Sequence, residues 1–81
     1  MKYQPKGVCP SSIDVELSDD IIQSVSFTGG CNGNLQGISK LVEGMKAQDA
    51  IERLQGITCG HRVTSCPDQL ANALTAMISN K

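Results

Sequence analysis

Residues 12–28, SIDVELSDDIIQSVSFT, decide the fold, because apolar and polar side chains alternate in them on both sides of a short polar turn. Ahead of the turn, Ile13, Val15 and Leu17 fall on one face, which is the period of a half-buried strand. The Ser-Asp-Asp sequence at 18–20 favours a turn, since short polar side chains hydrogen-bond to their own backbone. This stretch therefore predicts a β-hairpin with one apolar face.

The second half of the hairpin, residues 21–28, alternates in the same way. A strict period of two leaves Ile22 on the polar face and puts three apolar residues on the other, namely Ile21, Val25 and Phe27. Residues 2–4 add a short edge strand, which Pro5 limits because proline has no amide to donate.

C-terminal to the hairpin, the apolar residues recur at helical spacing. A first helix, which Asn32 or Asn34 can cap, is predicted to end at Gly44, and a second one, over 47–54, at Gly56. These two helices would follow the sheet directly.

The last helix has the clearest start. Pro67 suits a first helical turn, and Ser65 with Asp68 three residues later is similar to a capping box. Its apolar stripe has helical spacing and consists of Leu70, Leu74, Met77 and Ile78. The pattern as a whole predicts an α+β fold: an N-terminal antiparallel β-hairpin or three-stranded sheet, followed by three helices packed on one face.

Length and charge exclude several classes of protein. With 81 residues the chain has room for one domain, 1–81, whose small core needs a staple such as a metal or a disulfide. A net charge of −1 and two aromatic residues argue against nucleic-acid binding. The sequence has no apolar run long enough to span a membrane and no signal peptide, so a cytoplasmic protein without membrane contact is expected.

Four cysteines carry most of the candidate chemistry, because cytoplasmic thiols stay reduced and are available as ligands or redox groups. Cys9 precedes the first strand of the hairpin, Cys31 follows the second, and Cys66 stands at the start of the last helix, where a thiolate is favoured. If that helix crosses the sheet, these three thiols converge, and Cys59 or His61 can complete a tetrahedral set for zinc or an iron–sulfur cluster. Residue types and spacing leave redox thiols and buried, inert thiols open as alternatives.

A glycine-rich loop lies between the hairpin and the first helix, a setting in which backbone amides bind anions. Its candidate cofactor-binding residues are Gly29, Gly30, Gly33 and Asn34. The loop has neither dinucleotide-binding nor Walker spacing, so the alternative is that its glycines let the chain turn and position Cys31. Catalysis of the Cys–His kind would need His61 beside a cysteine and a third group such as Asp68; we assign no catalytic residue.

Residues 64–68, TSCPD, carry a resemblance to a known family, together with GVC at 7–9, FTGGCNGN at 27–34 and CGHR at 59–62. The chain resembles the stand-alone TSCPD-domain proteins, a bacterial family of about this size. A similar domain lies near the C-terminus of adenosylcobalamin-dependent ribonucleotide reductases, where its cysteines are thought to bind metal or to serve thiol chemistry. The resemblance implies an accessory role to ribonucleotide reductase in nucleotide metabolism and DNA replication. It also implies an association with oxidoreductase activity and nucleotide binding. The chain is too short to be a complete reductase.

A more distant similarity, to the iron–sulfur scaffolds of the IscU/NifU type, implies the same fold. Cys9, Cys31 and Cys66 fall where the three cluster ligands of those scaffolds lie, and Gly44 falls in the break between their helices. Cys59 adds a fourth thiolate, and a closed site of this kind suits a resident metal better than a transferable cluster.

Three hypotheses follow for the function. The first is a metal-binding module in which four thiolates hold zinc or, as the alternative, an iron–sulfur cluster, with ribonucleotide reductase or a nucleotide as the partner. The second is a thiol-redox protein that supplies electrons to a ribonucleoside-diphosphate reductase by cycling Cys59 and Cys66. The third is a cluster scaffold. The expected metal ligands are Cys9, Cys31, Cys59 and Cys66; the sequence leaves the oligomeric state open.

Overall fold

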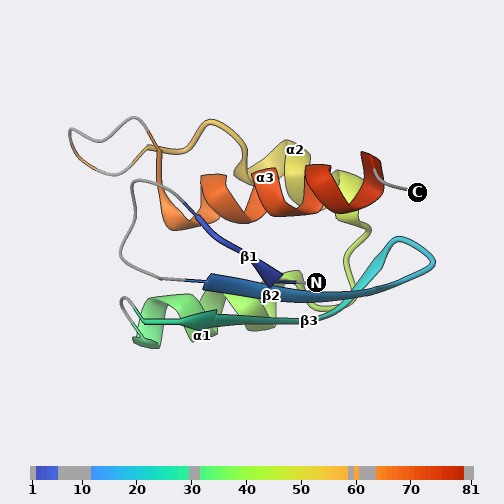
Figure 1. The fold of residues 1–81 in the computed structure, drawn as a ribbon, viewed down its shortest axis with the longest axis horizontal. Helices are drawn as coiled ribbons and strands as arrows, with labels where there is room; N and C mark the ends of the chain where they lie inside the picture. The colour runs from blue at the N-terminus through green and yellow to red at the C-terminus, as the bar shows by residue number, and fades with distance from the viewer. Residues whose placement is uncertain (1, 6–11, 30–31, 59, 61–63, 80–81) are drawn as a thin grey trace.

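The structure, a computed structural model, describes residues 2–5, 12–29, 32–58, 60 and 64–79 (Figure 1). It confirms the α+β fold, with a three-stranded antiparallel sheet followed by three helices. The elements in chain order are β1 (Lys2–Tyr3), β2 (Ser12–Ser18), β3 (Ile21–Thr28), α1 (Asn32–Val42), α2 (Ala47–Leu54) and α3 (Cys66–Ser79).

The sheet has the order β1-β2-β3, so that β2 is central and β3 is the long edge strand. Strands β2 and β3 are joined by a two-residue turn in which Asp19 and Asp20 both have positive φ, at 52° and 66°. This is the turn geometry that matches the twist of a hairpin, and aspartate tolerates it better than most residues. The predicted hairpin is therefore confirmed, with its turn at the predicted place.

A β-bulge in β3 makes one sequence prediction wrong. Glu16 pairs with Ser24 but Leu17 pairs with Ile22, so the register shifts and Gln23 is left over. Beyond this bulge the faces exchange, since one extra residue breaks the period of two. Ile22, at 1% exposure, is therefore the core residue, and Ile21, predicted to share the apolar face, is only half-buried.

The helices cover one face of the sheet, as predicted. On that face Ile13, Val15 and Val25 are buried, while Asp14 and Glu16, which point the other way, are exposed. The helices contribute the rest of the core cluster, which consists of Val42, Ala47, Ala50, Ile51, Leu70 and Leu74. Among the described residues no helix is long and apolar enough to cross a membrane.

The two helix breaks fall at the predicted glycines, since Gly44 and Gly56 have φ of +85° and +81°. The break at Gly44 also reaches the sheet. The Ile22 amide donates to the Met45 carbonyl at 2.9 Å, and the Gly44 amide donates to the Ile22 carbonyl at 2.8 Å. The segment around Lys46 thus forms a short bridge along the outer side of β3, where the strand begins.

Four chain segments meet at one end of the molecule. Figure 1 shows that β2 begins, β3 ends, and α1 and α3 begin toward the same end of the longest axis. The pairing of Ser12 with Thr28 closes the β2–β3 ladder there. Helix α3, which begins at this end, has Cys66 as its first residue.

Candidate functional site

Cys66, the one predicted ligand among the described residues, is the first residue of α3. Its thiol is half-buried. Pro67 follows it, so the helix begins as predicted, with proline in its first turn. The first amides of a helix lack partners within the helix, and together with the helix dipole they favour a thiolate at this position.

Ser65 fixes the start of α3. Its hydroxyl accepts a hydrogen bond from the Asp68 amide at 3.1 Å, which is the bond of an N-cap, and its carbonyl accepts one from the Gln69 amide at 2.8 Å. The same hydroxyl donates to the Ile57 carbonyl at 2.6 Å. The Ser65 half of the predicted capping box is confirmed, and it also ties the start of α3 to the loop that leaves α2. The Asp68 carboxylate accepts its hydrogen bonds from Gly56 and Thr64 in place of the Ser65 amide.

The Asp68 carboxylate joins α3 to the end of α2. One of its oxygens accepts a hydrogen bond from the Gly56 amide at 2.7 Å, and the other accepts one from the Thr64 hydroxyl at 2.5 Å. The Thr64 hydroxyl and then the Gly56 amide hold the pKa of Asp68 below its ordinary value, against a smaller opposing effect of burial. Gln69 adds support, since its side-chain amide donates to the Thr64 hydroxyl oxygen at 2.9 Å.

These residues form one cluster, which we call the α3 cap cluster, and sequence reasoning found only part of it. Its members are Gly56, Ile57, Thr64, Ser65, Asp68 and Gln69. The capping spacing identified Ser65 and Asp68, but the roles of Thr64 and Gln69 were missed. The available signal was the run of polar residues at 64, 65, 68 and 69 around a helix start. Both oxygens of Asp68 serve the cluster, which gives this residue a structural role.

A cleft of about 510 Å³ lies between the starts of α1 and α3. Cys66 lines it from α3, and Gly33 and Asn34 line it from α1. The remaining lining residues are mostly apolar: Leu35, Gly37, Ile38, Leu41, Ser65 and Pro67. The structure therefore brings together Cys66 and two residues of the predicted cofactor-binding loop.

The glycine-rich loop joins β3 to α1, as predicted. Gly29 has a φ of +84°, which glycine adopts without steric cost. It lines another cavity, beside β3, and not the cleft that contains Gly33 and Asn34. Gly30 lies outside the described residues. Anion binding by the four residues together stays a prediction.

Three of the four predicted metal ligands, Cys9, Cys31 and Cys59, lie outside the described residues, as does His61. Within the described residues there is no group of three or more His, Cys, Asp or Glu side chains that could hold a metal ion. Because that search did not reach these three cysteines, the four-thiolate site stays a prediction.

The comparisons with known proteins give one match. The family model of the TSCPD domain matches residues 1–78. No curated protein and no solved structure matches the chain.

Proposed function

The chain belongs to the TSCPD domain family, and we propose that it is a metal-binding module in which four cysteines hold one zinc ion. The ligands are Cys9, Cys31, Cys59 and Cys66. The family match gives the domain type, and the support for each ligand comes from the described residues that flank each cysteine in the sequence.

The observation that carries the proposal is the cleft that Cys66 shares with the start of α1. Gly33 and Asn34 line this cleft, and in the sequence they follow Cys31 by two and three residues. Two helix N-termini at one cleft provide amides that favour thiolates, the form in which cysteine binds metal. Cys66, the described ligand of the four, thus lies where a thiolate is favoured.

The α3 cap cluster supports the inclusion of Cys59. The hydrogen bond from Ser65 to the Ile57 carbonyl, at 2.6 Å, closes the base of the loop that contains this cysteine. Cys59 comes two residues after Ile57, and Cys66 comes directly after Ser65. Along the chain, Cys59 is therefore two residues from one partner of this hydrogen bond, and Cys66 is adjacent to the other.

The β2–β3 ladder supports the inclusion of Cys9. Ser12 pairs with Thr28 at the end of this ladder. Cys9 comes three residues before Ser12, and Cys31 comes three residues after Thr28. The two segments therefore leave the sheet at the same end, which is also where α1 and α3 begin (Figure 1).

Four thiolates without an open position form a structural site for zinc, which contributes directly to folding energy. The core of this domain is small, and a metal that joins the sheet to the starts of α1 and α3 would staple it. The proposed partner is a ribonucleotide reductase, in line with the enzyme in which a similar domain is found. An iron–sulfur cluster on the same ligands is the alternative.

The test is elemental analysis after anaerobic purification, on the wild type and on Cys66→Ser. We expect one zinc per chain in the wild type, and a joint loss of zinc and of melting temperature in the variant. Pro67→Ala is the matched control, because it alters the neighbouring position at the helix start without removing a ligand. A brown protein that contains iron would instead indicate that an iron–sulfur cluster occupies the same site.

A thiol-redox protein is the second candidate, because the Ile57–Ser65 bond also draws the segments that contain Cys59 and Cys66 together. It predicts a metal-free protein with a titratable disulfide between these two cysteines. Unchanged melting of Cys66→Ser, with no metal in either protein, would contradict the zinc proposal.

A further inference from the structure

Within the part of the chain that the structure describes, the outer side of the edge strand β3 has a backbone pairing partner only where the strand begins. There the chain itself adds a short bridge, through the hydrogen bonds of Ile22 with Gly44 and Met45. Among the residues that the structure describes, no strand continues this bridge beyond Ile22, and β3 pairs with β2 alone. The second half of β3 therefore has an open edge.

The groups at this open edge belong to Val25 and Phe27. In an antiparallel pair, residues on one face direct their amides and carbonyls to the same side of the strand. Ile22 faces the core and directs its own groups outward, to Met45 and Gly44. Val25 and Phe27 pair with Val15 and Ile13 on that same face, so their amides and carbonyls point outward too. Val25 and Phe27 are two residues apart, so their outward-pointing groups are spaced about 7 Å along the strand.

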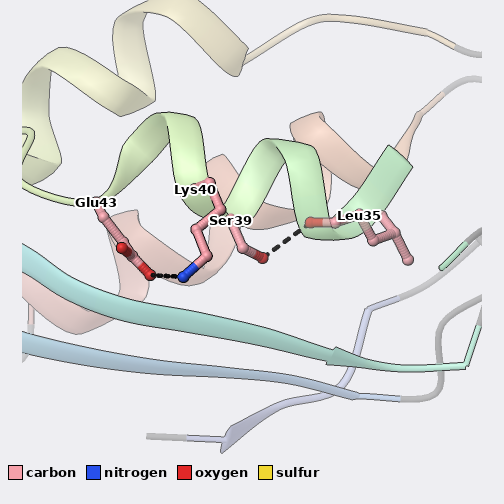
Figure 2. Close-up of polar contacts among 4 residues, drawn as sticks. All are labelled: Leu35, Ser39, Lys40 and Glu43. Carbon is pink, nitrogen blue, oxygen red and sulfur yellow. Dashed lines mark hydrogen bonds and ion pairs between the residues drawn. The ribbon is translucent and has the colours of Figure 1, made fainter. Parts of the chain in front are cut away.

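A groove of about 330 Å³ runs along this edge, under α1. Its strand side includes Val25, Ser26 and Phe27, and its helix side includes Leu35, Gln36, Ser39, Lys40 and Glu43. Figure 2 shows two polar contacts of the helix side: Lys40 pairs with Glu43 at 3.7 Å, and the Ser39 hydroxyl donates to the Leu35 carbonyl at 2.9 Å. The groove thus has an open strand edge on one wall and a helix on the other.

The sequence of β3 does nothing to block pairing at this edge. Natural edge strands are protected by charged residues, by proline, by β-bulges, by being very short, or by a helix or loop that covers the edge. Strand β3, IIQSVSFT, has eight residues, without charge and without proline. Its bulge lies near Gln23, before the open part of the edge, so Val25 to Thr28 stays regular.

We propose that this groove binds an extended peptide segment of a partner protein, which adds to the sheet as a fourth strand beside Val25 and Phe27. Main-chain hydrogen bonds to these two residues provide the affinity, and α1 limits the side chains that fit. The peptide needs no net charge where it faces α1, because Lys40 and Glu43 carry opposite charges 3.7 Å apart on that wall. The proposal does not depend on the proposed metal, although Gly29, which also lines the groove, comes two residues before Cys31.

The size of the groove favours a single peptide strand over a second copy of the chain. A second β3 would bring its own α1, which packs along its own β3 and would have to occupy the same space. A groove of about 330 Å³ between one strand and one helix leaves no space for a second helix. Self-association through β3 is accordingly an outcome that would contradict the proposal.

The test is amide hydrogen exchange by NMR on the full chain, with a soluble capped peptide of alternating valine and serine as the probe. In the free protein, the Val25 and Phe27 amides should exchange fast and the Ser24 and Ser26 amides slowly, since the latter two face β2. The peptide should slow exchange at Val25 and Phe27 by at least about tenfold, as expected when a main-chain bond forms. The same peptide with its backbone amides N-methylated along both edges of the strand cannot donate these hydrogen bonds and should give no protection.

A matched pair of variants locates the binding. Gln36→Trp fills the groove from α1 and should weaken peptide binding by at least about tenfold, or 1.4 kcal/mol. Gln48→Trp, at an exposed position of α2, should leave binding unchanged. Protection of Val25 and Phe27 without peptide, protection that rises with protein concentration alone, or equal binding of the fully N-methylated peptide would each overturn the proposal.

Discussion

The side chain that does most to position the candidate site is Asp68. Its carboxylate links the end of α2, through the Gly56 amide, to the Thr64 hydroxyl next to the N-cap of α3. The sequence predicted the cap at Ser65 because that bond spans three residues and has a known spacing. It did not predict the bond to Gly56, which is twelve residues away and depends on how α2 and α3 pack.

Replacing Asp68 by Asn should therefore destabilise the fold. An amide has one acceptor oxygen, so one of the two donors, Gly56 or Thr64, would lose its partner and face an NH₂ group instead. We expect a loss of about 1–2 kcal/mol in the free energy of unfolding, measured by urea denaturation. Glu52→Gln, an exposed substitution on α2, is the control and should change stability little. Equal stability of the two variants would show that the Asp68 bonds contribute nothing.

The same carboxylate predicts a pH dependence. Because the folded-state pKa of Asp68 lies below its ordinary value of 3.8, its stabilising effect is complete above that value and is lost as the pH falls through the lowered pKa. The stability difference between the wild type and Asp68→Asn should thus be constant near neutral pH and shrink in acid. Urea denaturation of both proteins at several pH values measures it, and acid effects common to both cancel. A difference that grows in acid would contradict this assignment.

Among the elements, β3 shows most clearly the limit of predicting which residues are buried from sequence periodicity. The helix breaks at Gly44 and Gly56 and the hairpin turn at 18–20 were predicted correctly, because each is a local property of the chain. The core-facing residue at the start of β3 was not, because the bulge opposite Leu17 depends on pairing with a second strand. The bridge around Lys46 escaped prediction for the same reason.

The bulge makes Ile22, and not Ile21, the residue on which the core depends. Ile22→Ala removes a side chain that is 1% exposed and should cost about 2–5 kcal/mol, whereas Ile21→Ala, at a half-buried position, should cost clearly less. The two variants differ only in position, so each controls for the other in thermal or urea unfolding. A strict alternation through β3 predicts the reverse order, and finding that order would disprove the register.

At the scale of the whole molecule, the fold places the starts of α1 and α3 at the end of the sheet where β2 begins and β3 ends (Figure 1). The sequence predicted the layers, since one apolar face of a sheet must be covered by helices. It could only conjecture that the last helix returns to the β3–α1 loop. The cleft lined by Cys66, Gly33 and Asn34 shows this return, which brings together segments so distant in the chain that their proximity has no sequence signature.

The most direct test of the proposed metal site is X-ray absorption at the zinc edge on anaerobically purified protein. The account predicts a first coordination shell of four sulfur atoms at about 2.3 Å, with no nitrogen or oxygen ligand. Cys66→Ser should lower the sulfur count or abolish the signal, while Pro67→Ala should leave it intact. A shell dominated by nitrogen and oxygen, or a folded wild type that carries neither zinc nor iron, would contradict it.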